Sequence, residues 1–237
     1  MQTLILAGGL GTRLGSLASD TPKPMLEVAG RPFLELQLRY LASQGIRDVV
    51  LCTGHRAERV RDHFGDGATL GLSIAYAIED RPLGTGGAVR NALPLIADER
   101  ILICNGDSFV RFDVAELTRV HGQLGTLASM ILVSVEDAGR FGIVELAADG
   151  RVVAFAEKVA RGAGLVNAGV YVVERRLVEE LPSGTSSLER DVFPTLTDGR
   201  LGGLPVAGPL IDIGTPAALD AARTDQMLAA LAVLQPC

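Results

Sequence analysis

The spacing of apolar residues along the first 125 positions changes repeatedly between two patterns. Short apolar runs that end in a glycine or a polar residue predict strands, and apolar residues three and four apart predict helices. The predicted strands are 4–8, 48–54, 73–78 and 101–105, and the predicted helices are 32–44, 57–64, 86–96 and 113–122. Asp113 is the expected N-cap of the last of these helices. Strands and helices that alternate at this spacing are typical of a parallel sheet covered by helices on both faces. We therefore expect an α/β fold whose first half is a Rossmann-like layer.

The second half of the chain has a different pattern, because strands follow one another with few helices between them. The predicted strands of this region are 129–135, 142–146, 151–157 and 165–173. The turn sequence AADG at 147–150 predicts that two of them form a hairpin. We therefore expect a mixed, mainly parallel sheet, in which an α+β region is inserted into the Rossmann-like layer.

The final segment returns to the first pattern. A strand at 210–214 precedes a helix from Pro216 to Leu234, for which Thr215 is the expected N-cap. The apolar residues of this helix lie on more than one face, which fits either a docked terminal helix or a contact between the subunits of a homodimer. No linker rich in proline, glycine or serine separates the parts, so we expect residues 1–237 to form a single domain.

Composition limits the kinds of ligand that the protein can bind. The 22 lysines and arginines are outnumbered by 28 aspartates and glutamates, and a net charge of −6 provides no electrostatic footprint for nucleic acid or an anionic membrane. The longest apolar runs are far shorter than the roughly 20 residues of a membrane-spanning helix, and the start of the chain lacks the basic segment of a signal peptide. We therefore expect a cytoplasmic protein, in which any polyanionic ligand is small and held by local positive groups.

A glycine-rich loop, AGGLGTRL at residues 7–14, follows the first predicted strand. This position places its backbone N–H groups at the carboxyl edge of the sheet, where ligands of open α/β folds bind. Leu14 stands where the dinucleotide-binding fingerprint needs its third glycine, and the chain contains no Gly-Lys pair for a P-loop. An NAD-dependent oxidoreductase and a P-loop kinase are therefore disfavoured. The loop alone also fits a simple glycine turn with a surface arginine.

Two basic residues favour the phosphate-binding interpretation of this loop. Arg13 belongs to it, and Lys23 follows between Pro22 and Pro24. Because the two prolines stiffen the backbone, the lysine is presented from a rigid segment. A fixed arginine and a fixed lysine beside backbone amides, in an otherwise acidic protein, predict a polyphosphate site.

Two aspartates are candidates for binding a metal ion. Asp107 follows the predicted strand 101–105, and Asp212 lies in the predicted strand 210–214. Each alone fits a turn or a helix cap. Together, beside a phosphate site, they could supply two oxygen ligands to Mg²⁺, which typically binds through one or two carboxylates, substrate phosphates and water.

The motifs LAGGLGTRL, PKPM, PLGTGGA, NGD, a Glu-Lys pair, NAG and IDIGTP occur in an order that resembles the sugar-1-phosphate nucleotidyltransferase family over nearly the whole chain. GRPFLE, FGDG, PLGTGGA, SLERDVFP and IDIGTP are most similar to the D-glycero-α-D-manno-heptose 1-phosphate guanylyltransferases. The resemblance implies that an oxygen of a sugar 1-phosphate attacks the α-phosphate of a nucleoside triphosphate, releasing pyrophosphate. It also implies a role in nucleotide-sugar supply, of the kind that serves bacterial surface polysaccharides.

The resemblance assigns residues 1–125 mainly to the nucleotide, about 126–200 mainly to the sugar, and 201–237 to a returning strand and helix. Arg13 would neutralise the departing pyrophosphate, Lys23 would hold phosphate oxygens, and the two aspartates would bind Mg²⁺. The residues implied to bind the nucleotide are Leu6, Ala7, Gly8, Gly9, Gly11, Thr12, Arg13, Lys23, Glu79, Gly84 and Thr85.

On the sugar side, the resemblance points to four positions. Glu157 would bind sugar hydroxyls and Lys158 the sugar phosphate, while Gly142 and Asn167 match the other sugar-side positions. The family often follows the Glu-Lys pair with proline, and this chain has Val159 instead. Heptose as the sugar follows from the resemblance only, and mannose, N-acetylmuramate and glucose stay open.

Glu79 is the residue that indicates which base the protein binds. Some uridylyl-transferring relatives place a glutamine at this position, five residues before Gly84. An ionised carboxylate only accepts hydrogen bonds, which suits the adjacent N1–H and N2–H₂ donors of guanine and conflicts with the two carbonyls of uracil. Glu79 therefore favours a guanylyltransferase, although it also fits a solvated carboxylate at a strand end.

A different class of protein fits part of the same pattern. A catalytically silent subunit that binds a nucleotide sugar and regulates an active partner would keep the binding loop. Such a sensor could lose Lys23 or the metal ligands and still bind. Because the chain has Arg13, Lys23, Asp107 and Asp212, we expect an enzyme.

Overall fold

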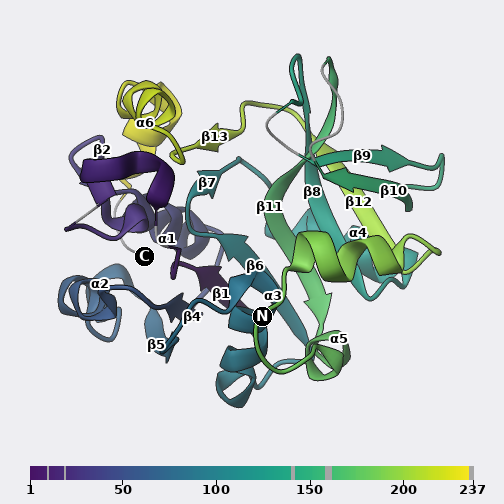
Figure 1. The fold of residues 1–237 in the computed structure, drawn as a ribbon, viewed down its shortest axis with the longest axis horizontal. Helices are drawn as coiled ribbons and strands as arrows, with labels where there is room; N and C mark the ends of the chain where they lie inside the picture. Colours follow the sequence, from purple (N-terminus) through teal and green to yellow (C-terminus); the bar gives the residue numbers. More distant parts are fainter. Residues whose placement is uncertain (10, 19, 140–141, 158–161, 235–237) are drawn as a thin grey trace.

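A nine-stranded mixed sheet forms the centre of the computed structural model, which describes residues 1–9, 11–18, 20–139, 142–157 and 162–234 (Figure 1). Four strands of the first half are parallel, in the spatial order β5-β4-β1-β6. Their bounds are Gln2–Leu6 for β1, Asp48–Thr53 for β4, Ser73–Ile78 for β5 and Arg100–Asn105 for β6. This order, with β1 between β4 and β6, confirms the Rossmann-like layer.

A long strand, β11 (Gly164–Glu174), joins this layer to the second half. Its last residues pair antiparallel with β6, and the same strand pairs with β8 and β9. The remaining strands are β8 (Ala128–Val135), β9 (Gly142–Leu146), β10 (Val152–Glu157) and β12 (Leu201–Val206). β9 and β10 form the predicted hairpin, so the inserted α+β region is continuous with the central sheet.

Helices cover both faces of the sheet, as predicted. On one face lie α1 (Phe33–Ser43), α2 (Ala57–Phe64), α4 (Val114–Leu124), α6 (Pro216–Arg223) and α7 (Gln226–Ala232), and on the other lie α3 (Gly84–Ala92) and α5 (Arg175–Glu180). Adjacent strand residues enter opposite cores, because successive side chains point to opposite faces. Ile5 packs in the first core and Leu4 in the second, both fully buried. This two-sided burial explains the continuous apolar run of β1.

Two differences from the predicted elements concern strands. β1 ends at Leu6, two residues before the predicted end, and the glycine loop begins there. Strand β12 was not predicted, because Gly202, Gly203 and Pro205 weaken a strand pattern. β12 pairs with β8 as an outer strand of the sheet, at a position where proline is tolerated. A Cβ on Gly202 would stand 2.7 Å from the side chain of Leu124, so α4 needs glycine there to pack closely.

The C-terminal segment also differs from its prediction. The strand expected at 210–214 is the short β13 (Ile211–Asp212), which lies outside the central sheet and pairs with β7 (Ser108–Phe109). The single helix expected from Pro216 to Leu234 is two helices, because Asp225 begins the second by accepting hydrogen bonds from two backbone amides.

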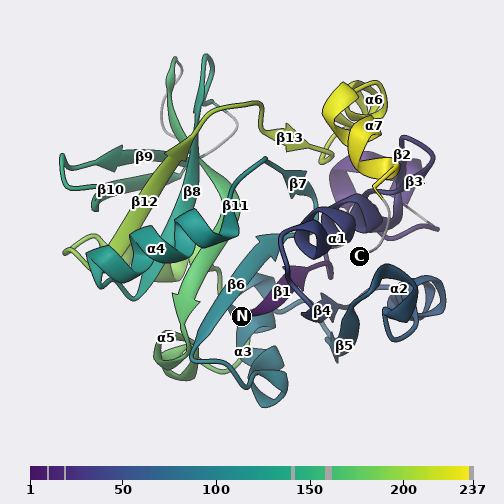
Figure 2. The same ribbon diagram turned by 180° about the vertical axis from the view of Figure 1, so that it is seen from behind.

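The last helix is docked within the molecule. α7 packs on α1, where Arg31 Nε donates to the carbonyl of Ala232 at 2.7 Å (Figure 2). The predicted N-caps Thr215 and Asp113 are both confirmed, since each side chain accepts from a backbone amide of the first helical turn. Among the described residues, no helix is both long and apolar enough to cross a membrane.

Candidate active site

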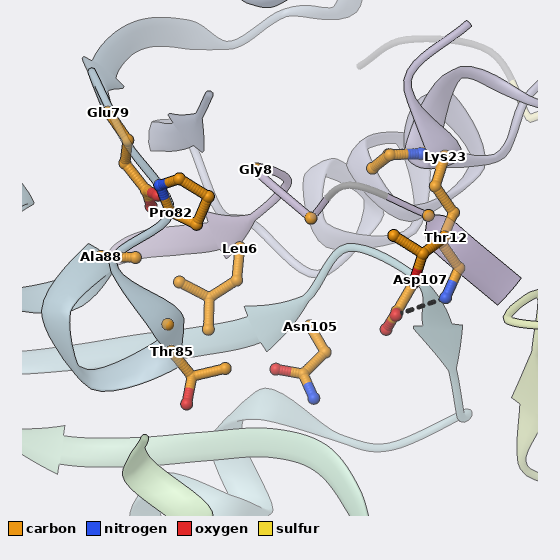
Figure 3. Close-up of a pocket in the computed structure, with 14 residues that line it drawn as sticks. Leu6, Gly8, Thr12, Lys23, Glu79, Pro82, Thr85, Ala88, Asn105 and Asp107 are labelled. Atoms are coloured by element: carbon orange, nitrogen blue, oxygen red, sulfur yellow. Dashed lines mark hydrogen bonds and ion pairs between the residues drawn. The ribbon is translucent and has the colours of Figure 1, made fainter. Parts of the chain in front are cut away.

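The carboxyl ends of β1 and β6 open into a cavity of about 380 Å³ (Figure 3). Its lining comes from the glycine loop, the turn before α3, the first turns of α3 and the turn after β6. The lining residues are Leu6, Gly8, Gly9, Gly11, Thr12, Lys23, Pro24, Glu79, Pro82, Gly84, Thr85, Ala88, Asn105 and Asp107. Glu79 and Thr85 lie toward one end and Lys23 and Asp107 toward the other, with Leu6 and Asn105 between them.

The structure brings most of the predicted nucleotide-binding residues to this cavity. Of the residues predicted to be catalytic or to bind the nucleotide, three are not among the lining residues, namely Ala7, Arg13 and Asp212. Ala7 is buried, and its backbone N–H donates to the carbonyl of Cys52 at 2.8 Å. Arg13 is exposed and lies next to Asp212 at the Lys23 end. The predicted loop, lysine and first aspartate therefore share one cavity, although they come from separate segments.

Backbone conformation and close contacts explain two of the glycines in the loop, Gly8 and Gly11. Gly11 has φ +63°, a conformation that favours glycine, and a Cβ there would stand 2.9 Å from Cβ of Ala18. A Cβ on Gly8 would stand 3.3 Å from the backbone nitrogen of Gly54, at the end of β4. The loop is held tightly against its neighbours, which keeps its backbone close to the cavity.

At one end of the cavity, Lys23 lies between the two predicted metal ligands. Its side chain is 7% exposed, and its Nζ is 2.5 Å from Asp107 Oδ2 and 3.9 Å from Asp212 Oδ1. A Cβ on Gly214 would stand 3.1 Å from both Lys23 Nζ and Arg13 Nη2. Glycine at this position therefore leaves room for two cations and two carboxylates to meet.

A short antiparallel pair brings the two aspartates together. β13 pairs with β7, with Asp212 opposite Ser108, and the N–H of Ile213 donates to the carbonyl of Asp107 at 3.0 Å. The Asp107 turn is fixed to β1, because a Cβ on Gly106 would stand only 2.7 Å from the carbonyl oxygen of Leu6. The two segments therefore meet at the edge of the parallel layer.

Gln37 of α1 holds the same turn from below. Its amide is buried, and Nε2 donates to the carbonyls of Asn105 at 2.9 Å and Ser108 at 2.7 Å. The two acceptors flank Gly106 and Asp107, so one side chain fixes both ends of the turn. Gln37 carries no sequence signal for this role, because it stands in an ordinary helical pattern.

The donor set at this end fits a divalent cation of the magnesium type. Two carboxylates converge, and hard cations prefer such oxygen ligands together with phosphate and water. Within the described part of the chain, no three side chains of the His, Cys, Asp and Glu type gather around one point. Asp107 and Asp212 would therefore hold the ion with help from substrate phosphates.

Glu79 stands at the opposite end of the cavity. Its Oε2 accepts from the backbone N–H of Leu83 at 3.2 Å, and its Oε1 lies 3.4 Å from where a Cβ on Gly8 would stand. Burial raises the pKa of Glu79 above the ordinary value for glutamate, and the hydrogen bond from Leu83 lowers it by less. The carboxylate thus braces the turn before α3 and also lines the cavity.

The glycines of the PLGTGGA segment allow close packing against residues 184–187. A Cβ on Gly84 would stand 2.5 Å from the carbonyl oxygen of Ser186, and one on Gly87 would stand 2.3 Å from that of Gly184. Ser186 also accepts hydrogen bonds from the N–H groups of Gly86 and Gly87. The first turn of α3 is therefore occupied by another part of the chain, a contact that the sequence pattern did not predict.

The predicted sugar-side positions lie on neighbouring strands. Glu157, at the end of β10, pairs with Gly142 at the start of β9. Val166 of β11 pairs with Ile143, so the antiparallel register places Asn167 beside Gly142. The three positions form one row across β10, β9 and β11. Lys158, predicted for the sugar phosphate, lies outside the described residues.

Four lining residues were missing from the sequence prediction, namely Pro24, Pro82, Ala88 and Asn105. Asn105 is the most informative, because its Oδ1 is buried without a hydrogen-bond partner in the described structure. A buried acceptor of this kind is costly unless a ligand or water satisfies it. Its position at the end of β6, directly before Gly106 and Asp107, is the signal that could have identified it.

Phosphate binding at the carboxyl edge of a Rossmann-like sheet is the common feature of nucleotide-binding α/β proteins, and this cavity has the residues for it. Comparison with known sequences shows which family of nucleotide-binding α/β proteins the chain belongs to. Residues 2–226 match the family model described as nucleotidyl transferase, so the chain belongs to this family. The family resemblance seen in the motifs is confirmed.

Individual relatives agree with the family assignment. The chain is 36% identical over 218 residues to a D-glycero-α-D-manno-heptose 1-phosphate guanylyltransferase of Aneurinibacillus thermoaerophilus, covering 91% of this chain and 94% of that protein. It is 39% identical over 221 residues to a mannose-1-phosphate guanylyltransferase of Mycobacterium tuberculosis, covering 91% of this chain but only 62% of that protein.

A solved structure also matches the fold. The crystal structure of HddC from Yersinia pseudotuberculosis, complexed with GMP-PN, has a TM-score of 0.82 and 32% sequence identity, covering 94% of this chain and 97% of that one. The mixed sheet, with its parallel layer and its inserted region, is therefore the nucleotidyltransferase fold.

Proposed function

We propose that this protein is a guanylyltransferase that moves GMP from GTP to a sugar 1-phosphate and releases pyrophosphate. The observation that carries the proposal is the meeting of Lys23, Asp107 and Asp212 at one end of a cavity whose other end is Glu79. The first group suits a triphosphate and the second suits a purine edge. Guanylyltransferases among the relatives support the same reaction.

The reaction requires the protein to position the substrates and to supply positive charge, and it does not require a covalent nucleophile. Transfer at the α-phosphate requires the sugar-phosphate oxygen and the leaving pyrophosphate to be in line, with cations to offset the negative charge. Lys23 would hold phosphate oxygens at the transfer point, and Arg13 would neutralise the leaving pyrophosphate. Mg²⁺ bound to Asp107 and Asp212 would supply further positive charge at the phosphates.

Glu79 is proposed to select the base. Guanine presents two adjacent donors, N1–H and N2–H₂, and an ionised carboxylate can accept from such an edge. The carboxylate is already partly directed by the hydrogen bond from Leu83, so it does not swing freely. Uracil would place carbonyl oxygens against the same carboxylate, which is repulsive.

For the sugar, we propose D-glycero-α-D-manno-heptose 1-phosphate as the acceptor. The proposal is supported by the motifs GRPFLE and SLERDVFP and by the relative from Aneurinibacillus thermoaerophilus. Mannose 1-phosphate is the competing acceptor, because the relative from Mycobacterium tuberculosis is as similar. The nucleotide sugar formed in the reaction would be used in the synthesis of surface polysaccharides. We expect the transfer reaction to take place in the cytoplasm.

A matrix of substrates tests the proposal. Pyrophosphate release is measured with Mg²⁺ and each of GTP, UTP, dTTP, ATP and CTP against the 1-phosphates of the heptose, mannose, N-acetylmuramate and glucose. We expect the highest kcat/KM for GTP with the heptose, and Glu79→Gln should reduce the preference for GTP over UTP by about tenfold or more, the size of one base-edge contact. A preference for UTP contradicts the base assignment. No release with any pair would favour a silent regulatory subunit.

A further inference from the structure

One carboxylate, which is hydrogen-bonded to the cavity-lining Thr85, accepts hydrogen bonds from three hydroxyl groups. Glu189 lies in the short helical segment Leu188–Val192. Its Oε2 accepts from Thr85 Oγ1 at 2.6 Å and from Ser187 Oγ at 2.9 Å, and its Oε1 accepts from the Tyr171 hydroxyl at 3.1 Å. Such a concentration of hydroxyl donors on one acid is more specific than a surface glutamate requires.

The direction of each hydrogen bond is fixed by a second partner. The hydroxyl of Thr85 accepts from the N–H of Leu188 at 2.8 Å, and the hydroxyl of Tyr171 accepts from Asn167 Nδ2 at 2.8 Å. A hydroxyl has one proton. Because a donor already approaches each oxygen, the proton of each hydroxyl is directed to Glu189. Two chains of hydrogen bonds therefore end at one carboxylate.

These two chains begin in different halves of the site. Thr85 lines the cavity in the first turn of α3, toward the end at which Glu79 stands. Asn167 lies on β11 beside Gly142, in the row predicted to bind the sugar. Tyr171 connects them and is fully buried, so water cannot replace its partners. Burial and the charge of Glu189 raise the pKa of Tyr171 well above its ordinary value, so the phenol keeps its proton.

The hydroxyl of Thr85 is also unable to donate a hydrogen bond to a ligand. It donates to Glu189 and accepts from Leu188, which uses its one proton and one of its lone pairs. A base could therefore contact this residue through its backbone, its methyl group or the second lone pair of the hydroxyl, but it could not accept a hydrogen bond from that hydroxyl. The position of these contacts depends on how firmly Glu189 holds the side chain, which makes the carboxylate a determinant of geometry rather than a ligand.

We propose that Glu189 is a positioning residue that couples the two halves of the site, by holding Thr85 on the nucleotide side and, through Tyr171, Asn167 on the sugar side. The proposal rests on the proposed transferase function. The proposed role requires a carboxylate, because only a carboxylate can accept from all three hydroxyls with both of its oxygens. Glutamine has the same shape but offers one oxygen and an amide that also donates.

The test combines Glu189→Gln, Thr85→Val and Tyr171→Phe, singly and in pairs, with Glu58→Gln on the exposed face of α2 as the matched control. We expect Glu189→Gln to raise the KM for the triphosphate and for the sugar 1-phosphate by about tenfold or more each, the scale of a hydrogen bond to a charged group. Tyr171→Phe should raise the KM for the triphosphate as well, although Tyr171 lies on the sugar-side strand. Thr85→Ser, which keeps the hydroxyl, should restore most of the loss seen with Thr85→Val.

The double variants distinguish coupling between these residues from independent effects of each substitution. In the Glu189→Gln background, Thr85→Val and Tyr171→Phe should each cost less than half as much in log(kcat/KM) as in the wild type, because the acceptor is already impaired. Additive effects, or a KM change confined to one substrate for each variant, would overturn the proposal. Thermal unfolding of every variant checks that folding is intact, and a purely structural role would lower the unfolding temperature without moving either KM.

Failure of the positioning role can be distinguished from failure of the proposed function in the substrate matrix. If the wild-type protein prefers UTP to GTP, the proposed base preference fails, and the same set of variants is measured with UTP. If the wild type turns over no pair, the transferase function fails, and coupling is then tested by calorimetric titration of Mg-GTP and mannose 1-phosphate. In that case, wild-type affinities unchanged by Glu189→Gln overturn the positioning role.

Discussion

Lys23 occupies the space between two carboxylates that would otherwise repel each other. Its ammonium is almost fully buried and contacts both Asp107 and Asp212. Removing one member of such a group leaves the others uncompensated, which is costly in a buried position. If Asp107 and Asp212 bind a metal ion as proposed, the lysine would compete with that ion for the two carboxylates as long as no phosphate is present to draw it away.

This competition predicts how metal binding changes with the lysine. Lys23→Met keeps most of the length of the side chain and removes its charge, so Mn²⁺ without nucleotide should bind about tenfold tighter or more than to the wild type, equivalent to about 1.4 kcal/mol. Electron paramagnetic resonance of free Mn²⁺ measures this directly. Lys23→Met combined with Asp107→Asn is the control and should lose the gain. Equal affinities of wild type and Lys23→Met would contradict the competition.

Glu79 predicts a pH dependence at the same scale. Burial raises its pKa, so the side chain takes up a proton at a higher pH than an ordinary glutamate does. If the ionised form reads guanine, kcat/KM for GTP should fall as the pH is lowered through this raised pKa. Glu79→Gln has no such titration and should lack that part of the decline. A pH profile with an identical acidic limb in both proteins would exclude Glu79 as the group that titrates.

At the scale of elements, the first turn of α3 is held by contacts that need glycine. Gly87 approaches the carbonyl of Gly184 so closely that a Cβ would stand 2.3 Å away, with Leu83 on its other side. Gly122 in α4 is also helical, but a Cβ there meets only the end of the Arg100 side chain, 3.8 Å away. Close packing therefore requires glycine at position 87, whereas no close contact requires it at position 122.

Alanine at each position should have opposite effects on stability. Gly87→Ala forces α3 away from residues 184–187 and should lower the free energy of unfolding by about 2 kcal/mol or more. Gly122→Ala should raise it by about 0.5–1 kcal/mol, because glycine is a poor helix former at an exposed position. Urea denaturation measures both. A stable Gly87→Ala variant with wild-type KM values would mean that the contact with residues 184–187 does not hold α3.

At the scale of the whole molecule, β11 belongs to both halves. It pairs with β6 of the parallel layer and with β8 and β9 of the inserted region. The two halves therefore share hydrogen bonds along one strand rather than meeting across a linker. This connection supports the prediction that the chain is a single domain.

A shared strand predicts a single unfolding transition. Differential scanning calorimetry should give one peak, with a calorimetric enthalpy close to the van't Hoff enthalpy. Mg-GTP should move the whole peak to higher temperature, because a ligand that binds only the native state stabilises every part that unfolds with it. Two peaks, of which only one responds to Mg-GTP, would show that the halves unfold independently.

The sequence alone determined the alternation of strands and helices in the first half and the position of the glycine loop. It also predicted Arg13, Lys23 and the two aspartates as site residues. These features depend on local spacing and on residue chemistry, which a single chain displays directly. It also indicated the hairpin in the second half and two N-caps. It missed β12, because glycines and a proline hide an edge strand, and it joined two terminal helices into one.

Only the tertiary structure decided which of these residues meet. Asp107 and Asp212 converge because β13 pairs with β7, and the glycines of PLGTGGA are explained by packing against residues 184–187. The hydroxyl groups that surround Glu189 come from three separate segments. Contacts of this kind depend on long-range pairing and packing, for which the periodicity of a sequence contains no signal.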